Sequence, residues 1–181
     1  MFLLIAILLG VAAGMVMGGR PHNLVRVPLR WNGLIFLALS IQVLSSTDRL
    51  PIPSSLVPSV YVLSNLIALI WLGRNIRVQG IPCAMLGSVS NLAAIVANGG
   101  RMPVDGGLLL GALPPNRVLA TGQTRLTWLI DRFLLPPPFP FPTVFSIGDL
   151  LIGLGIAWLM VAGMRPTARE AASPPSTDVA A

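Results

Sequence analysis

Long apolar runs separated by short polar segments dominate the pattern of this chain. Five of them approach the length of about 20 residues that an α-helix needs to cross a bilayer. The runs lie at 2–18, 32–47, 54–73, 80–98 and 144–163. The pattern therefore predicts an all-α fold, a polytopic membrane helix bundle with about five transmembrane helices.

The composition supports the same fold class. Hydrophobic residues make up 54% of the 181 residues, charged residues make up 10%, and the mean hydropathy is +0.81. Soluble domains carry far more charge. We expect residues 1–163 to form one bundle domain, packed through small residues because lipid offers helices no hydrophobic gain on association. The Ala-, Pro- and Ser-rich residues 164–181 are expected to be a disordered cytoplasmic tail.

The arginines predict how the bundle is oriented. The twelve cationic residues are all arginines, scattered singly rather than in basic runs, which argues against nucleic acid as a partner. Loops rich in arginine stay on the cytoplasmic side of a membrane. Such loops contain Arg20, Arg26 and Arg30, then Arg74 and Arg77, then Arg165 and Arg169. We therefore expect a multi-pass inner-membrane protein with its N-terminus outside, its C-terminus in the cytoplasm and segment 99–143 outside.

Three features organise the expected external segment. Residues 105–113 are apolar but too short to span a membrane, so they are either interfacial or re-entrant. In "TRLTWLIDRF", residues 124–133, leucines and Phe133 recur at helical spacing, which predicts an amphipathic helix on the membrane surface. "PPPFPFP", residues 136–142, predicts a stiff polyproline strut that leads into the last span.

Polar residues within the apolar runs predict a small pocket that opens outward. Gln42, Asn91, Asn98 and Asp149 all fall toward the external ends of their spans. Polar atoms in lipid face the interior of a bundle, where they either line a pocket or hold two helices together. Arg101 follows Asn98-Gly99-Gly100, and it either folds back over the pocket to pair with an aspartate or contacts lipid headgroups.

Asp149 lies where the last span begins. Ser146 and Asp149 have the spacing of a capping box, in which the two residues satisfy each other's backbone amides at the start of a helix. A cap explains an acidic residue at this depth without any catalytic role. The alternative is a working acid, for which Asp131 is the best available partner.

Several strings resemble an uncharacterised bacterial membrane-protein family, the domain of unknown function fifty-three seventeen. They are "NLAAIVANGGRMPV" at 91–104, "TRLTWLIDRF", and "FPTVFSIGDLLIGLG" at 141–155. With the N-terminal runs, the resemblance covers roughly residues 1–163. It implies a multi-pass fold and no established activity.

A fainter resemblance is to lipoprotein signal peptidase, an intramembrane aspartyl protease. Asp131 in "LIDRF" and Asp149 in "FSIGDL" take places analogous to the two catalytic aspartates of that family. The resemblance implies that these two residues are catalytic. The motif differs, however, because Ser146 stands where that family has Asn and Leu150 where it has Ser.

Two functions therefore remain open. The first is a non-catalytic membrane component: a scaffold, or a protein that binds a partner, a lipid-like ligand or a small molecule. The second is an aspartyl-type intramembrane hydrolase that uses Asp131 and Asp149. The expected partners are the lipid bilayer and either another membrane protein or a lipid-like ligand. Cys83 and His22 each stand alone in the sequence, so neither a metal nor a cofactor is expected.

Overall fold

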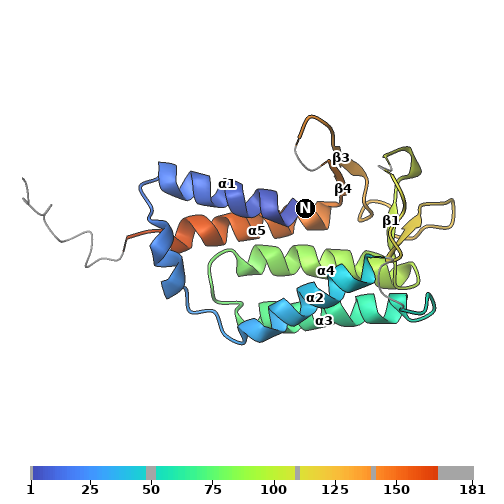
Figure 1. The fold of residues 1–181 in the computed structure, drawn as a ribbon, viewed down its shortest axis with the longest axis horizontal. Coiled ribbons are helices and arrows are strands. Elements are labelled where there is room, and N and C mark those ends of the chain that lie inside the picture. The colour runs from blue at the N-terminus through green and yellow to red at the C-terminus, as the bar shows by residue number, and fades with distance from the viewer. Residues whose placement is uncertain (1, 48–51, 109–110, 140–141, 167–181) are drawn as a thin grey trace, which may run out of the picture.

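The structure is a computed structural model that describes residues 2–47, 52–108, 111–139 and 142–166 (Figure 1). Most of the expected tail lies outside these residues. Five α-helices form the body of the molecule: α1 (Phe2–Val16), α2 (Asn32–Ser45), α3 (Val57–Arg74), α4 (Ile81–Ala97) and α5 (Ile147–Gly163). Each helix lies within, or within one residue of, an apolar run, so the prediction of helices in these runs is confirmed.

The helices pack in a spatial order that differs from their order in the chain. α1 packs on α5, α5 on α4, α4 on α3, and α3 on α2 (Figure 1). A short 3-10 helix, η1 (Pro21–Arg26), contacts both α1 and α5. The first and last of the described helices are therefore neighbours.

Glycines let α4 and α5 approach closely. A methyl group on Gly87 would overlap the backbone oxygen of Gly148, and one on Gly155 would lie 2.6 Å from the backbone oxygen of Gly80. In both cases the obstacle is backbone, which cannot move aside as a side-chain tip can. Packing through small residues is typical of helices that associate in lipid.

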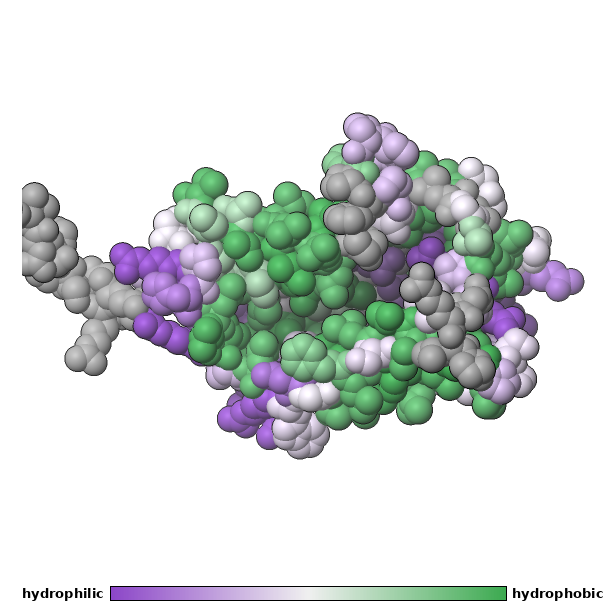
Figure 2. All heavy atoms as spheres, viewed as in Figure 1, coloured by the Kyte–Doolittle hydropathy of each residue, from purple (hydrophilic) through white to green (hydrophobic). Residues whose placement is uncertain are grey.

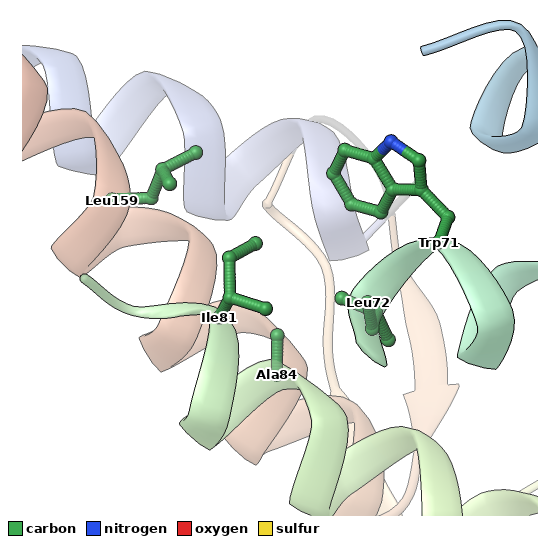
Figure 3. Close-up of a cluster of buried hydrophobic side chains, with 5 residues drawn as sticks. All are labelled: Trp71, Leu72, Ile81, Ala84 and Leu159. Carbon is green, nitrogen blue, oxygen red and sulfur yellow. The ribbon is translucent and has the colours of Figure 1, made fainter. Parts of the chain in front are cut away.

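A small core lies between α3, α4 and α5. Trp71, Leu72, Ile81, Ala84 and Leu159 are buried together there. Figure 3 shows Ile81 and Ala84 of α4 beside Leu72 of α3, with Leu159 reaching in from α5. Trp71 covers the α3 side of the cluster (Figure 3).

Large apolar side chains lie mostly on the outside of the helices. Leu8, Val16, Phe36 and Trp158 are all more than half exposed, whereas Ala38, Ser64 and Ala94 are fully buried. Figure 2 shows hydrophobic residues over the helical body and hydrophilic residues gathered toward its two ends. By length and composition, α3 alone among the described residues could cross a membrane, while the other four are apolar helices of 14 to 17 residues. Five transmembrane helices therefore stay a prediction.

The described residues between α4 and α5 form four short strands, so the fold is mostly helical rather than all-α. β1 (Met102–Val104) pairs in parallel with β2 (Arg117–Leu119), and β3 (Phe133–Leu135) pairs antiparallel with β4 (Thr143–Phe145). A further 3-10 turn, η2, covers Gly106–Leu108. We call this end of the bundle, from Asn98 to Ser146, the strand end.

Two predictions for this segment are wrong. Residues 124–133 form turns and a strand start rather than an amphipathic helix, because Leu129 and Ile130 are buried and Asp131 forms a β-bridge with Val104. These long-range contacts hold the segment in turns and bends that end in an extended stretch at Asp131. The polyproline strut is the second wrong prediction: its described residues 136–139 form a turn, because β3 and β4 on either side pair with each other and reverse the chain. Residues 140–141 lie outside the described residues. Between 105 and 113, the described residues form only η2 and bends.

Candidate functional site at the strand end

The site is built around the first turn of α5. The Ser146 hydroxyl accepts a hydrogen bond from the Asp149 amide at 3.0 Å, and the Ser146 amide donates to Asp149 Oδ2 at 3.1 Å. This is the capping box that the Ser-x-x-Asp spacing predicts. It satisfies two backbone amides that would otherwise lack partners at the start of the helix.

Asn91 of α4 joins this cap to the neighbouring helix. Its Nδ2 donates to Asp149 Oδ1 at 2.8 Å, and its Oδ1 accepts a hydrogen bond from the Ser146 hydroxyl, also at 2.8 Å. We call Asn91, Ser146 and Asp149 the cap triad. A side chain at Gly148 would overlap the Asn91 amide, so glycine makes room for the triad. Both carboxylate oxygens of Asp149 therefore accept a hydrogen bond inside the protein.

Asp131 lies at the junction of the two strand pairs. Its backbone amide donates to the Pro103 carbonyl at 3.0 Å, and its carbonyl accepts from the Asp105 amide at 3.0 Å. Its side chain is only 1% exposed and forms an ion pair with Arg117, with 3.0 Å between Nη2 and Oδ2. That contact lacks hydrogen-bond geometry, so Oδ2 is buried without a hydrogen-bond partner. An incompletely satisfied buried carboxylate is costly when it is ionised.

The buried environment of Asp131 changes the pKa of its carboxyl group. Burial raises the pKa of its carboxyl from 3.8 to about 7, although the Arg117 guanidinium lowers the pKa and the charge of Asp149 adds to the increase. At neutral pH this side chain can therefore gain or release a proton readily. A pKa near the working pH is what general acid–base chemistry requires.

The β3–β4 pairing brings Asp131 toward the head of α5. Phe133 pairs with Phe145, and the Arg132 amide donates to the Phe145 carbonyl at 3.1 Å. Asp131 precedes this pair and Ser146 follows it, so antiparallel pairing places Asp131 and the start of α5 at one end of the hairpin. The two aspartates also interact electrostatically, as the effect of Asp149 on the Asp131 pKa indicates.

The other residues predicted for the pocket do not join the triad. The Arg101 guanidinium donates to the Ser54 carbonyl at 3.1 Å rather than pairing with an aspartate. Asn98 exchanges hydrogen bonds with the Arg125 backbone, which fastens the loop to the end of α4. Gln42 on α2 forms no side-chain hydrogen bond with any residue that the structure describes. Of the two alternatives for Arg101, pairing with Asp131 or Asp149 is not observed among the described residues.

Arg117 is the functional candidate that the sequence did not reveal. It follows Pro114-Pro115-Asn116 in a stretch without a recognisable motif. It reaches Asp131 because β2 pairs with β1 while Asp131 bridges to Val104 on that same β1 strand. Such a three-way arrangement leaves no periodic signal in the sequence. Among the described residues, no group of three or more His, Cys, Asp and Glu could hold a metal ion.

A comparison with known protein families matches the part of the chain that contains this site. A family model described as "Family of unknown function (DUF5317)" matches residues 26–161, which is more than half of the chain. The chain belongs to this family. The part matched to DUF5317 includes Asp131, Arg117 and the whole cap triad, whereas α1 precedes it. Comparisons with curated proteins and with solved structures give no match.

Proposed function

We propose that this DUF5317 chain is a multi-pass integral membrane protein of the inner membrane. The distribution of its side chains supports this. Large apolar side chains such as Leu8, Phe36 and Trp158 face outward, while glycine, alanine and serine fill the helix contacts. In water, so much exposed apolar surface would favour aggregation, whereas lipid solvates it.

The arginines support an orientation with the strand end outside. Six of the ten described arginines lie in short segments at the opposite end of the bundle, which we call the arginine end: Arg20, Arg26, Arg30, Arg74, Arg77 and Arg165. The other four lie in the long segment between α4 and α5. Arginines in short loops set membrane orientation, whereas long segments cross regardless of their charge.

Within this membrane protein, the geometry favours a non-catalytic component that binds a partner or a lipid-like ligand. The cap triad is the observation that carries this conclusion. Both oxygens of Asp149 accept hydrogen bonds that fasten α5 to α4 and to its own cap. The cap triad therefore acts as a lock that holds α4 and α5 in one arrangement.

A second candidate is an aspartyl-type hydrolase, which the state of Asp131 favours. Its buried Oδ2 lacks a hydrogen-bond partner, its pKa is about 7, and the Asp149 charge acts on it. In such a centre, the ionised carboxylate takes a proton from water while the protonated one donates to the carbonyl oxygen of the substrate. Water oxygen bonds to the carbonyl carbon, and the departing amine leaves with a proton.

The variants Asp131→Asn and Asp149→Asn separate the two candidates. A strain that lacks the gene is complemented with each variant, and the termini of its membrane proteins are compared by mass spectrometry. A non-catalytic role predicts that Asp131→Asn complements fully and leaves those termini unchanged. It also predicts that Asp149→Asn lowers thermal stability, because an amide offers one acceptor where the triad uses two.

Ser146→Ala serves as the control, because it weakens the cap and leaves both carboxylates in place. If Asp131→Asn folds normally, fails to complement and accumulates uncleaved membrane proteins while Ser146→Ala does not, the hydrolase is correct and the non-catalytic proposal is wrong. Extraction with alkaline carbonate tests the membrane assignment, and release of the protein into the supernatant would contradict it.

A further inference from the structure

A cavity of about 710 Å³ lies at the arginine end, away from the strands. Its walls come from η1 and the chain that follows it, from the turn between α3 and α4, and from the end of α5. Its volume is within the range of small-molecule sites, about 300–1,000 Å³. In Figure 2, hydrophilic residues gather at this end of the molecule.

The cavity is strongly cationic. Five arginines line it: Arg26, Arg30, Arg74, Arg77 and Arg165. Its lining contains no acidic residue, and the carboxylates that the structure describes, those of Asp105, Asp131 and Asp149, belong to the strand end or the first turn of α5. The guanidinium groups of Arg30, Arg74, Arg77 and Arg165 repel one another, so an anion that enters the cavity relieves that repulsion.

A buried polar atom in the lining also lacks a partner. Asn23 is 2% exposed, and its Nδ2 is within hydrogen-bond distance, at 3.3 Å, of the Met164 and Arg165 carbonyls. Those contacts fix the orientation of the amide. Its Oδ1, by contrast, has no hydrogen-bond partner, although Asn23 lines the cavity. An acceptor without a partner, in a lining that also contains arginine donors, suits a ligand that carries a hydroxyl group as well as a negative charge.

The wall of the cavity is held in place before any ligand arrives. Asn75 at the end of α3 accepts a hydrogen bond from the Arg30 amide at 2.7 Å and donates to the Arg30 carbonyl at 3.0 Å. The Arg74 guanidinium lies 5.4 Å from the centre of the Trp31 ring. These contacts fix the backbone of Arg30 and the position of Arg74, which reduces the entropy lost on binding.

The lining combines this charge with apolar surface. Val27, Val78 and Leu159 face the same cavity as the arginines. We propose that the cavity binds a phosphate ester with a neighbouring hydroxyl group, its phosphate held by the arginines and its apolar part by these side chains. Arginine binds phosphate through paired, charge-assisted hydrogen bonds. The inference rests on the proposed membrane location, which makes an anionic phospholipid headgroup one source of this chemistry and a soluble phosphate ester the other.

The test uses the purified full-length protein in detergent micelles, titrated separately with phosphatidylglycerol, phosphatidylcholine and glycerol phosphate. Native mass spectrometry measures the bound species. We expect phosphatidylglycerol to bind at least about tenfold more tightly than phosphatidylcholine, because a single hydrogen bond to a charged group accounts for roughly that factor. Glycerol phosphate that binds as tightly as phosphatidylglycerol would identify the soluble source.

The double variant Arg30→Gln, Arg77→Gln should lower the affinity for the preferred ligand at least about tenfold. Arg20→Gln is the matched control, because Arg20 lies at the same end but does not line the cavity. Equal losses in both variants would mean attraction to the protein surface alone and would overturn the proposal, as would unchanged affinity in the double variant. Release in alkaline carbonate would contradict the membrane location only, since phosphate binding is measured independently of it.

Discussion

At the residue scale, Asp131 of the strand end and Asp149 in the first turn of α5 differ in the hydrogen bonds that their carboxylate oxygens accept. Asp149 uses both oxygens in the cap triad, whereas Asp131 has an ion pair and a buried oxygen without a hydrogen bond. The Ser-x-x-Asp spacing predicts the cap because all its atoms lie within one helical turn. Asn91 and Arg117 reach their aspartates from distant parts of the chain, so local spacing identifies neither partnership.

The raised pKa of Asp131 makes stability depend on pH. The folded protein keeps this proton up to about pH 7, whereas the unfolded chain releases it near pH 3.8. Between these values the folded state binds more protons, so the free energy of unfolding decreases as the pH rises. We expect the thermal midpoint of the purified protein to fall over this interval, and Asp131→Asn to remove most of the decrease.

Asp105→Asn is the control for this experiment, because Asp105 is exposed in the same segment. A wild-type midpoint that stays constant, or that rises with pH while the control behaves identically, would show that Asp131 does not titrate in this way.

At the scale of elements, the helices follow from the sequence and the strand end does not. Each apolar run contains a helix, and the sequence predicts these helices because the hydrophobicity and the length of a run depend on neighbouring residues alone. The error at 124–133 has a physical cause: leucine spacing suggested an amphipathic helix, but burial of Leu129 and the Val104–Asp131 bridge hold that segment in turns and bends. Contacts between distant segments determine the local structure here, and the spacing of residues within one segment does not predict such contacts.

The contact between α4 and α5 gives a prediction at this scale. Gly87→Ala should destabilise the protein by about 1–3 kcal/mol, because the added methyl group meets the α5 backbone. Thermal unfolding followed by circular dichroism measures the change. Gly73→Ala in α3 is the control, since a methyl group there has no neighbour within 4 Å and alanine favours helix by about 0.5–1 kcal/mol. Equal stability in the two variants would refute the close contact.

At the scale of the whole molecule, the two ends differ in charge and in the kind of structure they carry. One end holds strands and the described aspartates, and the other holds the arginine-lined cavity. Joined by helices with apolar outer faces, these ends are suited to the two sides of a bilayer. The proposed lock would then face outward, and the proposed phosphate site would face the cytoplasm.

Reporter fusions test this orientation. A reporter fused after Arg77 should behave as cytoplasmic, and one fused near Gln123 should behave as external, because short arginine-rich loops remain inside. Alkaline phosphatase and a fluorescent protein, active on opposite sides of the membrane, provide complementary measurements. Reversed activity at either position would place the strand end in the cytoplasm.

The packing of α1 against α5 constrains how the molecule is made. Along the chain, α1 is synthesised before α2, α3 and α4, whereas its main partner α5 is synthesised after them. During translation, α1 must therefore persist with its Gly10 surface uncovered until α5 has emerged. Chains interrupted before α5 can form the α2–α3–α4 contacts but leave α1 without its main partner. A chain whose synthesis stops before α5 therefore leaves the Gly10 surface of α1 exposed, which distinguishes it from a chain that has α5.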